Sequence, residues 1–224
     1  MPDLRAQSVA EMSADPHYQQ LLKNDRVRVF GISLRQSEQS LVRHDHNFLV
    51  VTLTDSDVVM WPEGRSDIQS YRFGEADVRF FFGGRAIGLR NNQTSEYRNI
   101  TVEFLDPSVT TFGYQPGSGE WNYGDSVLRS PVDPHAKFSN SMQLGAATVS
   151  DVQLLPGDSL GTPETPGAEL LIPITDLNLK STSDIHTRKS PGQVLWLKPG
   201  RKDELRNADM EPARFVLIEI PLKP

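Results

Sequence analysis

The stretch Gly84-Arg85-Ala86-Ile87-Gly88-Leu89-Arg90-Asn91 has a counterpart 116 residues further along the chain, Gly200-Arg201-Lys202-Asp203-Glu204-Leu205-Arg206-Asn207. The two octapeptides share Gly, Arg, Leu, Arg and Asn at matching positions. The same shift aligns the apolar run at residues 100–104 with the run at residues 216–220. A constant spacing across a turn and an apolar run indicates that one supersecondary unit occurs twice in the chain.

Upstream of these stretches the spacing widens to 120–121 residues. Leu34 then aligns with Leu154, and Thr54-Asp55 aligns with Thr175-Asp176, which places the length difference in loops. In both halves the apolar residues alternate or run in short bursts that end at turn residues, and no segment keeps a 3.6-residue period. This pattern is typical of strands and predicts an all-β protein.

Composition excludes several classes of function. The 23 basic and 29 acidic residues give a net charge of −6, and no Lys/Arg run is longer than a pair, which argues against a nucleic-acid binder. The absence of cysteine excludes disulfides, thiolate catalysis and Cys-ligated zinc. No apolar run approaches the roughly 18 residues of a spanning helix, so membrane insertion is not expected. Residues 1–15 lack the apolar core of a signal peptide, so export would imply a signal peptide ahead of this sequence.

Two short motifs link the repeat to a known fold. The first is His44-Asp45-His46 ahead of an apolar run, and the second is Phe82-Gly83-Gly84 leading to Asn91, which in the second copy becomes Lys198-Pro199-Gly200 leading to Asn207. These resemble the two motifs of the cupin superfamily, over about residues 16–105 and 145–220. The resemblance implies a bicupin: two cupin β-barrels of the jelly-roll type, formed by internal duplication in one chain.

The expected domains are an N-terminal cupin barrel at residues 1–106, an ordered linker at 107–141 and a C-terminal cupin barrel at 142–224. The linker is rich in Gly, Pro and Ser but also contains aromatic residues, which disordered segments lack, so we expect it to pack across the barrels; a flexible surface loop is the alternative. Its aromatic residues are Phe112, Tyr114, Trp121 and Tyr123. The first half also resembles a group of uncharacterised bacterial cupin-like proteins, and this resemblance implies a periplasmic or secreted protein.

The departures from the cupin motifs bear on function. The family's metal ligands are the two histidines of His-x-His, a following Glu, and a His in the second motif. In the first copy the Glu position falls at Val50 or Val51, and the second His position at Ile87 or Gly88, so two of the four ligands remain. In the second copy the ligand positions fall near Thr165, Gly167 and Asp203, and the set is lost.

His44 and His46 are the candidate ligand-binding and metal-binding residues. Because strand side chains alternate between faces, both share one face with Val42, Phe48 and Val50, and this face is apolar and therefore the predicted barrel interior. Two imidazoles can hold Mn, Fe, Ni or Zn, but such sites usually need three or four protein ligands. The candidates for a third ligand are the carboxylates and His17, His135, His186 and Tyr71. The alternative is a relic pocket with two neutral, hydrogen-bonded histidines.

The second copy and the repeated charges suggest two further features. Carboxylates at its barrel mouth could bind a cation or a sugar, or could simply be solvated. The residues concerned are Glu164, Glu169, His186 and Asp203. The pair Arg90 and Glu103 recurs as Arg206 and Glu219, which predicts an Arg–Glu contact on the outer face of each copy.

The sequence is compatible with three functions. The first is a non-catalytic or weakly active small-molecule binder, with a degenerate metal site in the N-terminal barrel and no assigned catalytic residue. The second is a metal-dependent oxygenase or isomerase that uses His44 and His46 with further ligands. The third is a structural or storage-type bicupin. A homo-oligomer is compatible with each of them.

Overall fold

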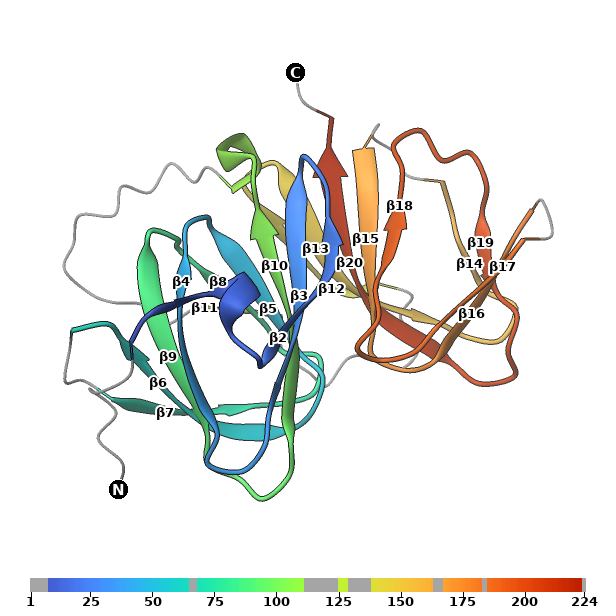
Figure 1. Cartoon of the computed structure of the whole chain (residues 1–224). Helices are drawn as coiled ribbons and strands as arrows, with labels where there is room; N and C mark the ends of the chain where they lie inside the picture. Colours follow the sequence, from blue (N-terminus) through green and yellow to red (C-terminus); the bar gives the residue numbers. More distant parts are fainter. Residues whose placement is uncertain are drawn as a thin grey trace. The chain divides into compact units, whose positions relative to one another are not determined.

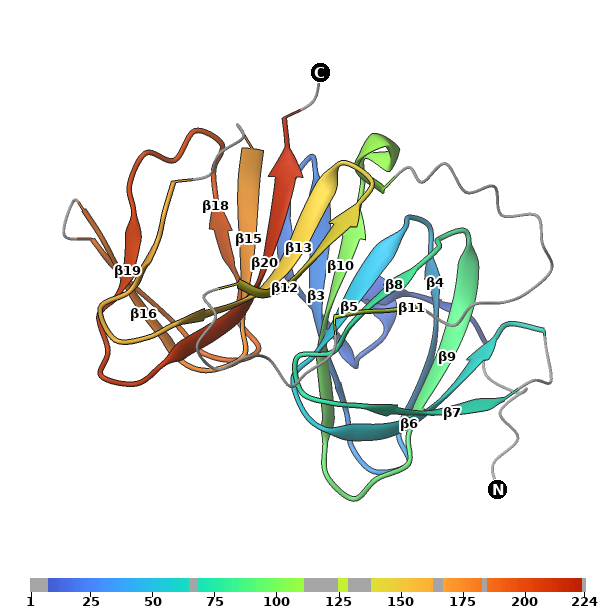
Figure 2. The ribbon, with the colours of Figure 1, turned by 180° about the vertical axis from the view of Figure 1, so that it is seen from behind.

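The computed structural model describes residues 8–64, 68–110, 125–128, 138–162, 167–182 and 185–222. The chain divides into two compact units, the first formed mainly by residues up to Leu105 and the second mainly by residues from Val127 onward (Figures 1 and 2). The four aromatic residues of the predicted linker lie outside the described residues. The expected domain boundaries therefore stay predictions.

The first unit, here the N-terminal barrel, consists of two facing sheets. One has the strand order β1-β4-β9-β6-β7, and the other has the order β11-β8-β5-β10-β3-β2. A short 3₁₀ turn, Met12–Ala14, follows β1. The strands are β1 Ala10–Glu11, β2 Tyr18–Lys23, β3 Val27–Leu34, β4 Gln39–His44, β5 Phe48–Thr52, β6 Ser56–Pro62, β7 Gln69–Phe73, β8 Val78–Phe81, β9 Arg85–Asn91, β10 Tyr97–Phe104 and β11 Asp125–Leu128.

The second unit, here the C-terminal barrel, is built in the same way. Its sheets have the orders β12-β13-β20-β15-β18 and β14-β19-β16-β17. A 3₁₀ turn at Pro107–Thr110 comes before its strands. The strands are β12 Phe138–Leu144, β13 Ala147–Leu154, β14 Ser159–Leu160, β15 Gly167–Pro173, β16 Leu177–Ser181, β17 His186–Lys189, β18 Leu195–Leu197, β19 Leu205–Asn207 and β20 Ala213–Pro221.

The two units share one topology, which confirms the predicted all-β fold and its duplication. The order β8-β5-β10-β3-β2 in one barrel matches β18-β15-β20-β13-β12 in the other, and β4-β9-β6-β7 matches β14-β19-β16-β17. The registers correspond too, because β10 opposes β3 with Glu103 facing Arg28, and β20 opposes β13 with Glu219 facing Thr148. Glu219 lies 116 residues after Glu103, and Thr148 lies 120 residues after Arg28, so the same two shifts relate the paired positions.

The recurring asparagine of the octapeptides has a structural role. Asn91 Nδ2 donates to the carbonyl oxygens of Leu34 and Ser95, at 3.0 and 2.7 Å. Asn207 Nδ2 makes the equivalent bonds to Leu154 and Glu211, at 3.0 and 2.8 Å. A buried side-chain amide that satisfies two backbone carbonyls ties the end of one strand to the next turn, which explains the same residue at both sites.

The interior of the C-terminal barrel is filled by apolar side chains. Phe215 and Leu217 of β20 project into a cluster that draws residues from both sheets. Such packing leaves little room for a ligand, because the interiors of folded proteins are close-packed. The buried members are Val152, Leu154, Leu160, Leu171, Leu177, Leu179, Leu205, Ala213, Phe215 and Leu217.

Candidate functional site

The N-terminal barrel, by contrast, encloses a cavity. Its empty volume is about 420 Å³, and this figure includes space that is open to solvent. None of the described residues that line it is Asp or Glu. The lining residues are Tyr18, His44, Phe48, Val50, Met60, Phe73, Arg79, Phe81, Ile87, Leu89, Tyr97, Asn99 and Thr101.

His44 lies in the wall of this cavity, at the end of β4. Its side chain is 4% exposed, and its ring stacks on Phe48 with 3.9 Å between centroids and 12° between planes. Phe48 in turn stacks on Phe81, its register partner across β5 and β8, with 5.0 Å between centroids. The expectation that His44 faces the interior together with Phe48 and Val50 therefore agrees with the structure.

His46 is placed differently from the expectation. Strand β4 ends at His44, and His46 lies in a bend before β5, half-buried and outside the cavity lining. The backbone of this bend packs closely against Gly83, because a Cβ on Gly83 would lie 2.3 Å from the backbone carbonyl carbon of His46. The amide of Gly84 donates to the carbonyl of His44 at 2.7 Å, and that of Gly83 donates to Asn47 Oδ1 at 3.0 Å. Side chains alternate between the two faces of a sheet only within a strand. Because β4 ends at His44, the imidazoles of His44 and His46 do not share a strand face.

Glu103 is the site residue that the sequence analysis missed. Its side chain is fully buried, and Oε1 lies 3.5 Å from His44 Nδ1. Oε2 accepts hydrogen bonds from Nε and Nη2 of Arg28, at 2.8 and 2.6 Å. Within the described part of the chain, His44 Nδ1 and Glu103 Oε1 have no hydrogen-bond partner. Two adjacent buried polar atoms without partners are costly, and a bound group or ordered water is the usual explanation.

The predicted outer-face contact between Arg90 and Glu103 is therefore wrong, and the contact predicted for the second copy stays a prediction. Glu103 points into the barrel and pairs with Arg28, whereas Arg90 Nε donates to Asn92 Oδ1 at 3.1 Å. In the second copy Arg206 Nε donates to the carbonyl of Gly157 at 2.8 Å. The arginines recur because each forms a hydrogen bond within or to a turn.

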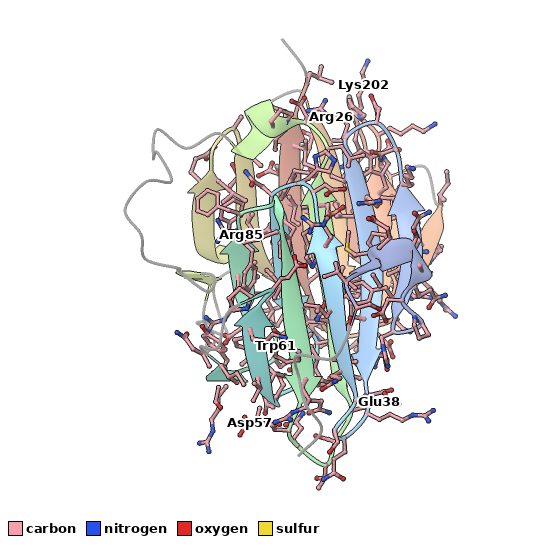
Figure 3. All side chains as sticks on the ribbon, turned by 60° about the vertical axis from the view of Figure 1, so that its left-hand side comes forward. Arg26, Glu38, Asp57, Trp61, Arg85 and Lys202 are labelled. Atoms are coloured by element: carbon pink, nitrogen blue, oxygen red, sulfur yellow. The ribbon has the colours of Figure 1, made fainter. Side chains whose placement is uncertain are left out.

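Glu103 lies toward one end of the N-terminal barrel. Figure 3 shows Arg26 and Glu38 at opposite ends of this barrel. The amide of Leu105 donates to the carbonyl of Arg26, which places Glu103 toward the Arg26 end.

A polar face on β10 could have identified Glu103. Tyr97, Asn99, Thr101 and Glu103 alternate along the strand and are all buried. Asn99 Nδ2 donates to the Tyr97 hydroxyl at 2.8 Å, and the Thr101 hydroxyl donates to Asn99 Oδ1 at 3.1 Å. The 116-residue shift aligns these positions with Ala213, Phe215, Leu217 and Glu219. Only the first copy keeps a polar interior face.

Two tyrosines supply neutral hydroxyls to the cavity wall. Burial raises the pKa of the Tyr97 phenol above its ordinary value of 10.0. Burial also raises the pKa of Tyr18, and the negative charge of Asp15 raises that pKa further. Asp15 in turn accepts hydrogen bonds from Ser40 Oγ at 2.7 Å and from the His17 amide at 2.9 Å. Both phenols therefore keep their protons at physiological pH and can donate a hydrogen bond.

Three of the residues proposed as a third metal ligand, His17, Tyr71 and His186, are not among the described residues that line the cavity. His17 Nδ1 lies 2.8 Å from Asp15, and the Tyr71 hydroxyl bonds to Gln69 Oε1 at 2.5 Å. His186 is exposed in the C-terminal barrel, and His135 lies outside the described residues. Among the described residues no group of three His, Cys, Asp or Glu side chains is close enough to hold a metal ion.

The described residues around the cavity do not fit the metal that the cupin fold implies. The cavity region offers His44 and Glu103, and Arg28 already neutralises that carboxylate. Protein metal sites usually have three or four ligands, so two donors of this kind make a weak site.

We expect the purified protein to contain well below one equivalent of Mn, Fe, Ni or Zn. Elemental analysis checks this on tag-free protein after incubation with each metal and desalting, with His44→Ala measured in parallel. Equal, low metal content in both proteins is the expected result. Near one equivalent in the wild type that is lost in His44→Ala would contradict it and restore His44 as a ligand.

The described candidate residues of the second copy do not form a group of three that could hold a metal ion. Glu169 forms a buried ion pair with Arg201, at 2.7 Å to Nε. Asp203 Oδ1 accepts a hydrogen bond from Thr182 at 2.8 Å, and Glu164 lies outside the described residues. A smaller hollow of about 270 Å³ lies beside Glu169 and Glu219. Arg201 compensates the charge of Glu169, one of the two carboxylates at this hollow.

No helix in the described parts of the chain has the length and apolar character needed to cross a membrane.

Comparison with known proteins bears on the fold. No family model and no curated protein matches the chain. Similar solved structures include AerE from Microcystis aeruginosa, with TM-score 0.69 and 11% identity over 94% of this chain and 95% of that one. A cupin 2 conserved barrel domain protein from Leptotrichia buccalis has TM-score 0.53 and 13% identity over 96% and 93% of the two chains. A deletion mutant of Bacillus subtilis oxalate decarboxylase OxdC has TM-score 0.57 and 14% identity over 88% and 69%. The shared topology of the two units and these similarities together identify the chain as a protein with the cupin fold, present as two barrels.

Proposed function

We propose that the N-terminal barrel is a small-molecule binding module, non-catalytic or weakly active, with its ligand in the cavity beside His44. The observation that carries this proposal is the difference between the copies. At matching positions of the central strands, one barrel has Asn99 and Thr101 and the other has Phe215 and Leu217. The apolar version fills its barrel, so polar residues are not needed for the fold.

Keeping a polar interior costs stability unless a ligand or water satisfies it. In the N-terminal barrel, His44 Nδ1 and Glu103 Oε1 are buried without a hydrogen-bond partner among the described residues. The cavity next to them has both apolar walls and polar groups that converge, which is the usual make-up of a small-molecule site. A metal-dependent reaction is less well supported, because the donor set does not fit a resident metal.

The C-terminal barrel is better explained as a structural part. Its apolar cluster occupies the interior, and its buried charges are compensated by partners such as the Asp151–Arg214 ion pair at 2.8 Å. After a duplication, one barrel can keep a polar cavity for a ligand while the other fills its interior with apolar side chains. The two barrels can therefore have different roles, binding in one and structural support in the other.

We expect the double variant Asn99→Phe/Thr101→Leu, which transplants the lining of the second barrel, to abolish ligand binding. Ligand-observed NMR with a library of small acids, amides and alcohols would identify wild-type ligands. The larger apolar side chains occupy the cavity, so affinity should fall by more than about tenfold while circular dichroism shows retained β-structure. Ser70→Leu, which adds an apolar side chain at an exposed site on β7, is the control. Unchanged binding in the double variant would place the ligand elsewhere and contradict the proposal.

A further inference from the structure

The cavity of the N-terminal barrel has room for only a few atoms. The part of it that the centre of a water molecule can reach has a volume of about 30 Å³. One water molecule needs roughly 10–15 Å³ on this scale, so the space holds about two water molecules or one organic molecule of similar size. The size of the cavity therefore restricts a ligand to about three non-hydrogen atoms.

His44 has one ring nitrogen beside Glu103 and lines the cavity with its ring. Its Nδ1 lies 3.5 Å from Glu103 Oε1. Both atoms are buried, and neither has a hydrogen-bond partner among the described residues. The two nitrogens of an imidazole lie on different edges of the ring, so Nε2 is the nitrogen that is left to meet a ligand.

Glu103 favours one tautomer of His44. Arg28 Nε and Nη2 both donate to Glu103 Oε2, which leaves Oε1 as the acceptor next to the imidazole. A carboxylate oxygen beside Nδ1 favours the tautomer with its hydrogen on Nδ1, because that hydrogen then points at the negative charge. In this tautomer Nε2 carries no hydrogen and accepts a hydrogen bond.

Tyr18 and Tyr97 provide the complementary donors in the same cavity wall. Burial raises the pKa of each phenol, so both keep their protons. The Tyr97 hydroxyl accepts a hydrogen bond from Asn99 Nδ2 at 2.8 Å, which leaves its own hydrogen to be donated. A single polar group that both donates and accepts, such as a hydroxyl, matches an imidazole acceptor and a phenol donor together.

We infer that the cavity binds a small uncharged hydrogen-bond donor, a short alcohol or primary amide, whose hydrogen is accepted by His44 Nε2. Glu103 is a positioning residue that holds His44 in the accepting tautomer. This inference rests on the proposed function and names the ligand class for the same site. An ammonium ion fits less well, since none of the described lining residues is Asp or Glu. A carboxylate also fits less well, because its lone pairs would face that of Nε2.

NMR of the histidine ring nitrogens tests the tautomer in the full chain at about pH 8, where an imidazole of ordinary pKa is neutral. We expect the hydrogen of His44 on Nδ1, with its signals assigned by their loss in His44→Ala. In Glu103→Gln, Arg28 keeps the amide oxygen because a guanidinium only donates, so the amide NH₂ turns toward His44. That group donates to Nδ1 and should move the hydrogen to Nε2. Glu63→Gln, in the exposed pair with Arg43, is the control and should change nothing.

Ethanol and acetonitrile are matched probes for binding, because they are similar in size and only ethanol can donate a hydrogen bond. A titration followed by the His44 ring signals should show ethanol binding in the millimolar range or more weakly, as expected for so few atoms. The wild type should prefer ethanol by about 2–10-fold, the factor for one net hydrogen bond. In Glu103→Gln this preference should vanish, because a hydrogen on Nε2 can be donated to either probe.

Several outcomes would overturn the inference. These are a hydrogen on Nε2 in the wild type, equal binding of the two probes, and a preference for ethanol that persists after the tautomer has changed in Glu103→Gln. Failure of both probes to move the His44 signals would also overturn it and leave a cavity that holds water only. If Glu103→Gln does not fold, the wild-type tautomer and the wild-type preference decide. If ethanol fails while a library ligand binds and is lost in Asn99→Phe/Thr101→Leu, the inference falls and the proposed function stands.

Discussion

Replacing Glu103 by Ala should lower the free energy of unfolding of the N-terminal barrel by about 3–5 kcal/mol, the cost of breaking a buried charge pair. The Glu103 side chain is fully buried and that of Arg28 is 20% exposed, so the substitution leaves a largely buried guanidinium without its carboxylate. His44 also loses Glu103 Oε1, which lies 3.5 Å from its Nδ1. Urea denaturation followed by circular dichroism would measure the change.

Two further variants make this result specific. Glu63→Ala removes the acidic partner of an exposed pair, in which Arg43 and Glu63 are 40% and 47% exposed, and should cost less than about 1 kcal/mol. The double variant Arg28→Met/Glu103→Leu removes both buried charges and should recover most of the stability lost in Glu103→Ala. A loss below about 1 kcal/mol for Glu103→Ala would mean that the buried cluster of Arg28, His44 and Glu103 does not form.

Gly88→Ala should be the next most destabilising change, at about 3 kcal/mol, because the barrel has no room for a methyl group there. A Cβ on Gly88 would lie 1.9 Å from Cε2 of Trp61, which is its register partner across β9 and β6 and is 4% exposed. In an unobstructed strand position the same substitution would usually stabilise the fold by reducing the entropy of the unfolded chain. The steric effect reverses that sign, and thermal denaturation would show it as a lower Tm.

Gly161→Ala is the matched control for Gly88→Ala. No heavy atom lies within 4 Å of the added Cβ at Gly161, so its effect should stay within about 0.5 kcal/mol. In the double variant Trp61→Ala/Gly88→Ala the ring that clashes is gone, so the cost should be less than the sum of the two single changes. Additive costs, or a neutral Gly88→Ala, would show that Trp61 does not pack across Gly88.

Local patterns predicted the site only in part. His44 was placed correctly because it ends a strand whose apolar neighbours alternate with it. His46 was not, since the bend depends on Gly83, 37 positions away in the sequence, approaching the backbone of His46. Glu103 was assigned to the outer face because its recurrence beside an arginine was interpreted as a local pair. Its partner is Arg28, which lies on the adjacent strand and 75 residues away.

By itself, the sequence determined the strand content, the duplication and the weakening of the metal motif. Strand content depends on the alternation of side chains and on turn residues, which can be identified within short segments. The duplication is visible because such segments recur at fixed shifts of 116 and 120 residues. Tertiary structure alone decided that an apolar cluster fills one barrel while the other has a cavity lined in part by polar side chains, and that Glu103 lies beside His44. The physical reason is that burial and charge pairing depend on which strands face each other across the barrel, and that arrangement is set by contacts between residues distant in the chain.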